Sequence, residues 1–278
     1  MSSATDPCRY AVFGNPIAQS RSPDIHAAFA AATGQPISYD RQAPPLDGFA
    51  EAAAQFFANA GCGLNVTMPF KGDAYAFADR LTERAMLAGA VNTLSLQENG
   101  EILGDTTDGV GLLRDLRDNL GWPIAAQKVL VLGAGGAVRG ILEPLLAELP
   151  QHLVIANRTV SKALDLAKLF AEHGYLIGCD YSMLAGQQFD LVINASGAGL
   201  AGEMTPLPDD LLLPGGRAYD LSYGGQPTAF LNWAQPRAAA SADGLGMLVE
   251  QAAESFYLWR GVRPSTASVI AGLRQFLS

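Results

Sequence analysis

The chain has 278 residues, of which 49% are hydrophobic and 16% are charged. This composition is typical of a compact globular protein and excludes a disordered one. The length suggests two domains, although it also permits a single large α/β domain. The formal charge of -9 at pH 7 argues against a nucleic-acid partner, because an acidic protein repels phosphate backbones. Any phosphate that the chain binds has to be held by a local cluster of donors and cations.

The cysteine, histidine and hydrophobic patterns argue against a disulfide-rich protein, a metal site and a membrane protein. Three cysteines are too few and too scattered for a disulfide framework, and three distant histidines have no metal-ligand spacing. They are Cys8, Cys62 and Cys179, and His26, His152 and His173. The start has no cationic region before an apolar stretch, and Arg139 and Glu143 interrupt the longest hydrophobic run. We therefore expect reduced thiols, no metal, no membrane contact and a cytoplasmic location.

The first third of the chain alternates short strand-like runs with alanine-rich helical runs. The segments are residues 10–13, 24–32, 37–39, 48–59 and 64–66. Such alternation predicts βαβ units and a mainly parallel sheet.

The last of these strands leads into a polar turn, Asn65-Val-Thr67-Met-Pro-Phe-Lys71. Asn65 and Thr67 offer hydrogen-bonding side chains, and Lys71 follows two apolar residues that can remove part of its hydration. A lysine in this setting can take part in proton transfer. The alternative is a surface lysine whose stem covers apolar surface while its ammonium stays in water.

A hairpin is expected next, from residues 93–96 to 102–103 with an Asn99-Gly100 turn, which would make the sheet mixed. Apolar residues then recur at helical spacing over 108–120, and Gly121-Trp-Pro123 ends the pattern. We place a domain boundary along that helix.

Alternation resumes with strands at 128–132, 153–156, 176–177, 191–194 and 218–221, which predicts a doubly wound domain. Pro144 falls inside the helix expected after Gly136, where it removes a hydrogen bond. Helices at 246–259 and 265–277 end the chain.

A glycine-rich turn follows the first strand of this second block. The turn is Gly133-Ala134-Gly135-Gly136-Ala137. Gly133 permits a tight turn, Gly135 lets the backbone approach a pyrophosphate, and the following helix offers free N–H groups and a positive dipole end. The third glycine position of the dinucleotide fingerprint holds Val138. The strand before and the helix after favour a dinucleotide site over a simple turn.

The end of the next strand indicates which dinucleotide. NAD sites carry an Asp or Glu there, whereas this chain has Asn157-Arg158-Thr159 with Lys162 one helical turn later. Arg158 can grip a 2′-phosphate with its planar fork. Two merely solvated cations would oppose the helix dipole, so we favour NADP.

With these motifs together, the chain resembles shikimate dehydrogenases, the NADP-linked enzymes of aromatic amino-acid biosynthesis, over nearly its whole length. The landmarks are Gly14-Asn-Pro-Ile17, Ser20-Arg-Ser22-Pro23, Asn65-Val-Thr67 with Lys71, Ala88-Gly-Ala-Val-Asn92-Thr93, Gly104-Asp-Thr-Thr-Asp108-Gly, the Gly133 loop, Asn157-Arg-Thr159, and Gly244-Leu-Gly-Met247 with Gln251.

The resemblance implies a two-lobed α/β protein. Residues 1–108 and 245–278 would form the substrate-binding and catalytic domain with a mixed sheet, and residues 109–244 would form a Rossmann-type NADP domain. Gly244 and Met247 would join the glycine loop and Asn157 to Lys162 in binding the cofactor.

The resemblance also implies residue roles. Ser20 and Ser22 would hold the substrate carboxylate, and Lys71 and Asp108 would form the catalytic acid–base pair. The ring hydroxyls would be contacted by Asn65, Thr67, Asn92, Asp108 and Gln251, with Tyr223 near the substrate. A polyhydroxylated ring needs many neutral donors and acceptors, which these residue types supply.

Each of these residues also has a structural alternative. Ser22 before Pro23 is a good helix N-cap, and Asp108 is another. Asn92 and Thr67 are common turn formers. A glutamine on a helix such as Gln251 is usually solvated, and Tyr223 can be a packing residue.

Two places depart from the usual family pattern. Thr106 stands where these enzymes usually carry Asn, and the loop Asn194-Ala-Ser-Gly-Ala-Gly199 is unusually rich in glycine. The first affects the surroundings of Asp108, and the second affects how the nicotinamide end is covered.

The implied reaction is NADPH-dependent reduction of 3-dehydroshikimate to shikimate. The alternatives are a dehydrogenase for quinate or another cyclic polyol, and a non-catalytic nucleotide-binding regulator that keeps the fold. A chain of this kind can be a monomer or a homodimer.

Overall fold

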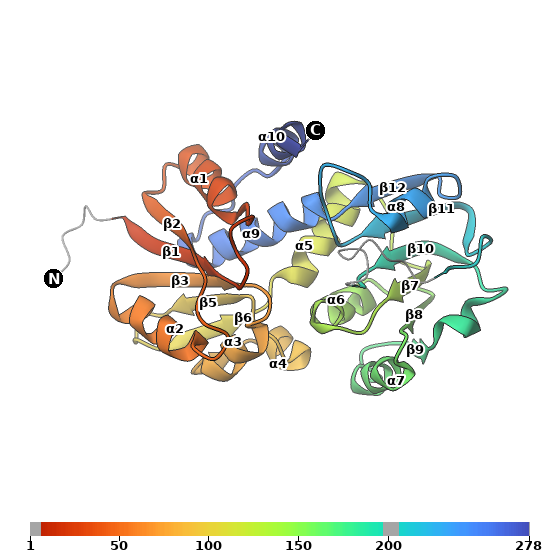
Figure 1. The fold of residues 1–278 in the computed structure, drawn as a ribbon, viewed down its shortest axis with the longest axis horizontal. Coiled ribbons are helices and arrows are strands. Elements are labelled where there is room, and N and C mark those ends of the chain that lie inside the picture. The colour runs from red at the N-terminus through yellow and green to blue at the C-terminus, as the bar shows by residue number, and fades with distance from the viewer. Residues whose placement is uncertain (1–6, 197–205, 278) are drawn as a thin grey trace. The chain divides into compact units, whose positions relative to one another are not determined.

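A computed structural model describes residues 7–196 and 206–277 of the chain (Figure 1). The chain divides into two compact α/β units, Met1–Gly111 with Val249–Val269, and Leu112–Leu248 with Ile270–Ser278. The expected α/β class with two sheets is confirmed. Residues 245–248 and 270–278, which the sequence analysis grouped with the substrate-binding part, cluster with the second unit, and residues 109–111 cluster with the first.

The first unit holds a six-stranded mixed sheet of order β2-β1-β3-β5-β6-β4. Its strands are β1 Cys8–Phe13, β2 Ile37–Gln42, β3 Gly61–Val66, β4 Arg80–Leu81, β5 Thr93–Leu96 and β6 Ile102–Asp105. β1 pairs in parallel with β2 and β3, whereas β5 is antiparallel to β3 and β6. The β5–β6 hairpin was predicted, and Gly100 takes the positive φ of +87° that its turn requires.

The helices of this unit place the polar turn after β3. They are α1 Ser22–Thr33, α2 Phe49–Ala58, α3 Lys71–Phe77, α4 Glu83–Ala88 and most of α9 Leu245–Arg260. Phe13, Phe49 and Phe70 are buried, with Phe13 edge-on to Phe49 and Phe49 5.4 Å from Phe70 between ring centroids. This packing anchors the residue that directly precedes α3.

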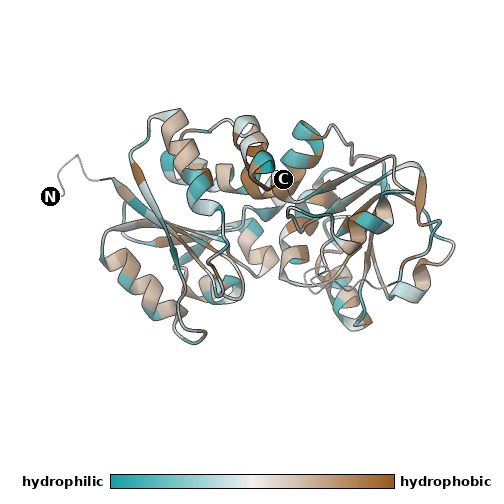
Figure 2. Cartoon of the chain, turned by 45° about the horizontal axis from the view of Figure 1, so that its top comes forward, coloured by the Kyte–Doolittle hydropathy of each residue, from teal (hydrophilic) through white to brown (hydrophobic). Residues whose placement is uncertain are grey.

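The second unit holds a six-stranded sheet of order β12-β11-β10-β7-β8-β9, in which every pair is parallel. Its strands are β7 Lys128–Leu132, β8 His152–Ala156, β9 Leu176–Cys179, β10 Phe189–Asn194, β11 Leu212–Asp220 and β12 Ala240–Asp243. This is the doubly wound Rossmann order, whose switch point lies between β7 and β10. The central strands of this sheet are apolar and are drawn largely in brown in Figure 2, as expected for a parallel sheet that is covered on both faces.

The remaining elements of this unit are α6 Gly136–Ala147, α7 Val160–Leu169, the 3₁₀ turn Tyr181–Leu184, α8 Ala229–Ala234 and part of α10 Ala267–Leu277. Pro144 lies inside α6 as expected. The single helix predicted over 108–120 is instead α5 Asp108–Arg114 followed by a π-helical turn, Asp115–Asn119.

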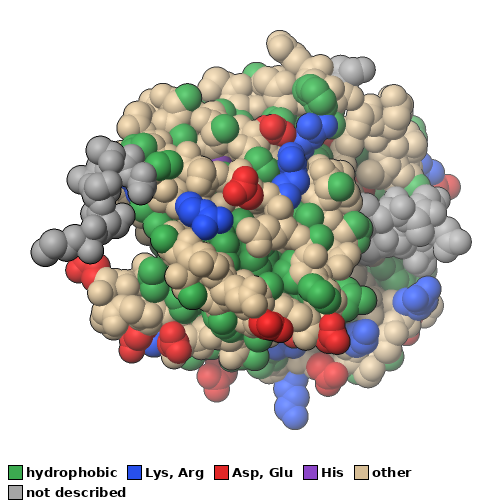
Figure 3. All heavy atoms as spheres, turned by 60° about the vertical axis from the view of Figure 1, so that its left-hand side comes forward, with side chains coloured by type: hydrophobic (Ala, Val, Ile, Leu, Met, Phe, Trp, Pro, Cys, Tyr) green, Lys and Arg blue, Asp and Glu red, His purple; other side chains and the backbone are tan. Residues whose placement is uncertain are grey.

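Two expected absences can be examined in the described part of the chain. No helix there is long and apolar enough to cross a membrane. No group of three or more His, Cys, Asp or Glu residues within residues 7–196 and 206–277 is arranged to hold a metal ion. On the face shown in Figure 3, acidic and basic side chains are interspersed.

Candidate active site and cofactor-binding loop

Lys71 and Asp108 form an ion pair in the first unit. The Lys71 Nζ lies 2.5 Å from Asp108 Oδ2, and the two side chains are 23% and 9% exposed. Lys71 is the first residue of α3, directly after the buried Phe70, and Asp108 is the first residue of α5. The lysine is therefore held by a nearly buried carboxylate, and the reading as a freely solvated surface lysine does not fit.

The carboxylate of Asp108 is held on its other side by Asn92. Asn92 Nδ2 donates to Asp108 Oδ1 at 2.9 Å, which leaves both carboxylate oxygens engaged by side chains. Asp108 is itself the first residue of α5, and its side-chain partners are Lys71 and Asn92 and not the first turn of that helix, which disfavours the helix-capping alternative.

Asn92 is the centre of a buried network. Its Nδ2 also faces Thr107 Oγ1 at 3.0 Å and Gln251 Oε1 at 2.8 Å, so three acceptors share two hydrogens. Its Oδ1 accepts from the Thr107 N–H at 2.9 Å and from Thr93 Oγ1 at 2.9 Å. Asn92 is 3% exposed, so turn formation alone does not account for these side-chain bonds.

Asn65 extends the network to another strand and helix. Its Oδ1 accepts from the Tyr39 hydroxyl at 2.7 Å, and its Nδ2 donates to Ser255 Oγ at 2.9 Å. Ser255 Oγ lies 2.8 Å from Thr93 Oγ1, which closes a loop back to Asn92. The structure thus brings Asn65, Lys71, Asn92, Asp108 and Gln251 into one connected set.

The sequence did not predict a site role for four further residues that bond to this set: Tyr39, Thr93, Thr107 and Ser255. Ser255 lies four residues after Gln251 on α9, so helical spacing would have placed both on one face. Thr107 adjoins Asp108 in sequence. Nothing in the local pattern marks Tyr39, whose hydroxyl meets Asn65 only through the pairing of β2 with β1 and of β1 with β3.

Ser20 and Ser22 lie together at the start of α1. Ser20 Oγ donates to Ser22 Oγ at 3.2 Å and accepts from the Ser22 N–H at 3.3 Å. The N-cap is Arg21, without a side-chain capping bond, so the structure contradicts the capping alternative for Ser22. Arg41 Nε supports this turn by donating to the Ser20 carbonyl at 2.7 Å.

Thr67 and Thr106 are set by backbone bonds. The Thr67 N–H donates to Phe13 O at 2.9 Å, and its carbonyl accepts from the Phe70 N–H at 3.0 Å, which makes it part of the turn before α3. The Thr106 N–H donates to Asp105 Oδ1 at 2.7 Å. Asp105 is itself fixed by Arg84 through two bonds of 2.6 Å.

The glycine turn lies in the second unit at the switch point of the parallel sheet. Gly133 has a φ of +112°, and a Cβ there would stand 2.9 Å from the Ala195 carbonyl oxygen, so only glycine fits. Around Gly135 and Gly136, no described atom lies within 4 Å of where a Cβ would stand. The first turn of α6 contains no acidic residue. Open space, backbone donors and a positive dipole end suit a pyrophosphate.

The residues after β8 form a second polar corner of this unit. Asn157 Nδ2 donates to Thr159 O at 2.8 Å, and Thr159 is the N-cap of α7 without a side-chain capping bond. Arg158 and Lys162 are exposed, and neither pairs with a carboxylate among the described residues. Two unneutralised cations at a helix start suit a phosphate monoester.

Gly244, Met247 and Tyr223 lie after β11 and β12 in the second unit. Gly244 donates its N–H to Ser222 O at 3.1 Å and packs on the Leu221 backbone, which leaves no room for a side chain. Packing therefore already explains this glycine. Met247 and Tyr223 are half-buried. Of the glycine-rich loop 194–199, residues 197–199 lie outside the described residues.

Known protein families match the chain in three segments. Residues 12–94 match the shikimate dehydrogenase substrate binding domain, residues 116–201 match shikimate / quinate 5-dehydrogenase, and residues 244–274 match the shikimate 5'-dehydrogenase C-terminal domain. The first and last matches lie mainly in segments of the first unit.

Individual relatives match over nearly full length. Shikimate dehydrogenase (NADP(+)) of Methylococcus capsulatus is 57% identical over 97% of both chains, and that of Janthinobacterium sp. is 57% identical over 100% of both. An Ael1 enzyme structure from Pseudomonas putida has a TM-score of 0.90 at 47% identity, covering 96% of this chain and 98% of its own. Shikimate 5-dehydrogenase from Thermus thermophilus, solved with NADP(H) and shikimate, has a TM-score of 0.85 at 34% identity, with 96% and 99% covered.

Proposed function

The chain belongs to the shikimate dehydrogenase family, and from that membership we propose that it catalyses the reversible NADPH-dependent reduction of 3-dehydroshikimate to shikimate. The observation that carries the proposal is the Lys71–Asp108 ion pair, set within a buried amide and hydroxyl network. Residues 1–108 and 245–278 would bind the substrate, and residues 109–244 would bind NADP.

Lys71 is the proton donor of the proposed reaction. NADPH supplies the hydride when it is bound. As the ketone carbon gains that hydride, its oxygen becomes an alkoxide, and the Lys71 ammonium donates a proton to it to give the alcohol. Asp108 holds the ammonium through Oδ2 and is itself fixed through Oδ1 by Asn92. In the oxidation direction Lys71 takes the proton back.

Neutral polar groups would recognise the ring of the substrate. Asn65, Asn92 and Gln251 carry amide groups that are already oriented by each other and by hydroxyl residues. A site that pairs each ring hydroxyl discriminates strongly against an analogue that lacks one. Ser20 and Ser22 would bind the carboxylate, helped by the positive end of the 12-residue helix α1. Thr67 and Tyr223 would complete the substrate contacts.

The cofactor contacts follow from the second unit. Gly133 to Ala137 and the start of α6 would receive the pyrophosphate, while Asn157, Arg158, Thr159 and Lys162 would receive the 2′-phosphate. Gly244 and Met247 would contact the nicotinamide end. We also expect a cytoplasmic monomer or homodimer that has no nucleic-acid partner.

The proposal is tested by following reduced-nicotinamide absorbance with shikimate or quinate, each with NADP or NAD. We expect the shikimate-with-NADP rate to dominate the four initial rates. A dominant quinate or NAD rate would replace the named activity with that of a related dehydrogenase. Binding of NADP without turnover in any combination would support the non-catalytic regulator.

A further inference from the structure

A buried carboxylate that the proposed reaction does not use lies in the π-helical turn after α5. Asp115 is 4% exposed, its Oδ2 accepts from the Tyr219 hydroxyl at 2.6 Å, and its Oδ1 accepts from Asn119 Nδ2 at 3.0 Å. Tyr219 is fully buried on β11. A π-helical turn is rare and recurs at functional sites, so this local departure from an α-helix calls for an explanation.

The carboxylate of Asp115 lies directly against the first turn of α9. A Cβ at Gly246 would fall onto that carboxylate, so the close approach is possible only because residue 246 is glycine. Met247 is the next residue along that turn. Burial raises the pKa of Asp115, with the nearby Asp243 carboxylate adding to the rise, and the hydrogen bonds from Tyr219 and Asn119 oppose it.

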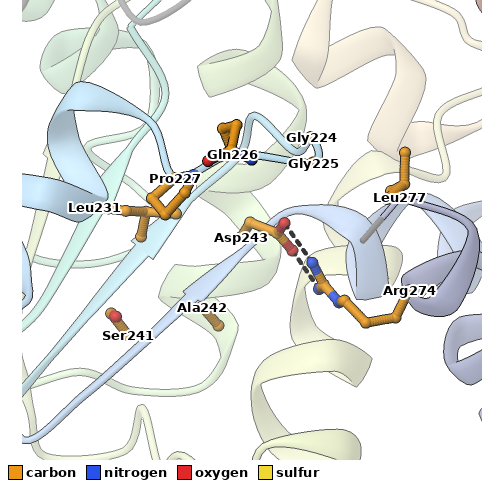
Figure 4. Close-up of a pocket in the computed structure, with 10 residues that line it drawn as sticks. All are labelled: Gly224, Gly225, Gln226, Pro227, Leu231, Ser241, Ala242, Asp243, Arg274 and Leu277. Carbon is orange, nitrogen blue, oxygen red and sulfur yellow. Dashed lines mark hydrogen bonds and ion pairs between the residues drawn. The ribbon is translucent and has the colours of Figure 1, made fainter.

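A second carboxylate holds the same turn from β12. Asp243 Oδ1 accepts from the Leu245 N–H at 3.2 Å, and Arg274 neutralises Asp243 through bonds of 2.5 and 2.6 Å (Figure 4). Asp243 therefore already places a carboxylate at the start of α9, and Arg274 balances its charge. Asp115 forms no ion pair within residues 7–196 and 206–277, and it lies against Gly246, one residue closer to Met247 than the Leu245 N–H that Asp243 accepts from.

We infer that Asp115 is a positioning residue for the cofactor, which fixes the Gly244–Met247 turn by packing against Gly246 while Tyr219 holds the Asp115 carboxylate. The inference rests on the proposed NADP-dependent function. Asp115 acts through the turn and not on reacting atoms, because its two carboxylate oxygens accept from Tyr219 and Asn119 and lie against Gly246. Its loss should therefore affect the cofactor and spare the substrate.

The test compares Asp115→Asn with the wild-type enzyme and with Asp118→Asn. Asp118 lies in the same π-helical turn, is exposed and pairs with Arg117, so it is a matched control outside the site. The readouts are the Kd for NADP⁺ by titration calorimetry, the KM for NADP⁺ and for shikimate, kcat, and Tm. In Asp115→Asn an NH₂ group replaces one carboxylate oxygen, so either the Tyr219 hydroxyl or the Asn119 amide loses the oxygen to which it donates. We expect about a tenfold rise in Kd and KM for NADP⁺, with the KM for shikimate changed less than about twofold.

A purely structural role would give a different pattern. It would lower Tm and the fraction of active enzyme, so kcat would fall while both KM values and the Kd stayed as in the wild type, and that result would overturn the inference. If Asp115→Asn does not fold, Tyr219→Phe replaces it, because it removes one hydroxyl and keeps the ring that packs edge-on to Trp122. It should raise the Kd for NADP⁺ about threefold, and an unchanged Kd would overturn the inference.

The same experiment separates this inference from the proposed function. A wild-type enzyme that neither binds NADP⁺ nor oxidises shikimate would overturn both. A wild-type enzyme that does both, with an Asp115→Asn variant that binds NADP⁺ equally well, would overturn only the role of Asp115.

Discussion

Asp108 fixes the direction of the Lys71 ammonium, so replacing Lys71 tests the role of a proton donor at one defined position. Lys71→Met keeps much of the apolar stem but removes the proton donor, so we expect turnover to fall by about two to four orders of magnitude. The Kd for NADP⁺ should stay the same, because all the proposed cofactor contacts lie in the second unit. Initial rates and calorimetry measure the two effects. Lys168→Met, at the exposed end of α7, is the control, and undiminished turnover in Lys71→Met would remove Lys71 from the mechanism.

Arg158 should contribute to the binding of NADPH but not to the binding of NADH. Its guanidinium is exposed and pairs with no carboxylate in the described part of the chain, so a 2′-phosphate would supply its counter-charge. Arg158→Ala should weaken NADPH by about ten- to a hundredfold and leave NADH nearly unchanged. The KM for each cofactor measures this. Lys162→Ala should show the same direction with a smaller effect, and an equal loss for both cofactors would contradict the 2′-phosphate role.

The glycine turn before α6 can be tested as the binding site of the pyrophosphate. A methyl group at Gly135 meets no described atom, and its φ of -90° suits any residue, so Gly135→Ala should leave Tm nearly unchanged. The same methyl group would stand where a pyrophosphate approaches, so we expect the Kd for NADP⁺ to rise about tenfold or more.

Gly272→Ala is the matched control for that substitution. Gly272 lies inside α10, also without a described neighbour near its Cβ position, so alanine there should stabilise the helix by up to about 1 kcal/mol and leave NADP⁺ binding unchanged. Thermal unfolding and calorimetry measure both variants. Tight NADP⁺ binding by Gly135→Ala would mean that this turn does not carry the pyrophosphate.

The elements that sequence predicted are those with a local signal of their own. Buried parallel strands are visible in the sequence as apolar runs, and the β7–α6 turn is visible as the glycine-rich dinucleotide fingerprint. Both patterns depend on residues that are close together in the chain. The strand β12 was missed because it is the exposed, polar run Ala240–Asp243 at the sheet edge. Helices α3 and α4 were missed because they have 7 and 6 residues, too few for a periodic pattern.

The network around Asn92 shows the limit of local reasoning. Asn65 stood out in the polar turn that ends an apolar run, and Asn92 was indicated by the family resemblance, whereas Tyr39 and Ser255 join them only through the sheet order and the packing of α9. The π-helical turn at Asp115 likewise has no signal in a sequence that continues the helical spacing of α5. Residues that join the site only through tertiary contacts could therefore not be predicted from the sequence and were identified from the structure.

At the scale of the whole molecule, stability in acid depends on a histidine buried without hydrogen bonds. His26 is 0% exposed, and neither ring nitrogen has a hydrogen-bond partner among the described residues. Its ring stacks on Tyr39 at 4.2 Å between centroids and lies 5.4 Å from Trp259. Burial lowers the pKa of His26 to about 3 against an ordinary value of 6.5, with the neighbouring Asn65 opposing the shift. The folded protein therefore holds this ring in its neutral form.

Between pH 6.5 and about 3 the unfolded chain binds a proton on His26 and the folded chain does not, so the free energy of unfolding falls as pH falls. From pH 7 to pH 4.5 this site should cost about 2–3 kcal/mol. His26→Leu keeps an apolar side chain of similar size and has no such proton, so its stability should fall by that much less over the same range. Urea unfolding at both pH values measures the difference, and effects near the pI of 4.8 cancel because both proteins share them. Equal pH dependence in the two proteins would mean that the His26 ring becomes protonated in the folded state.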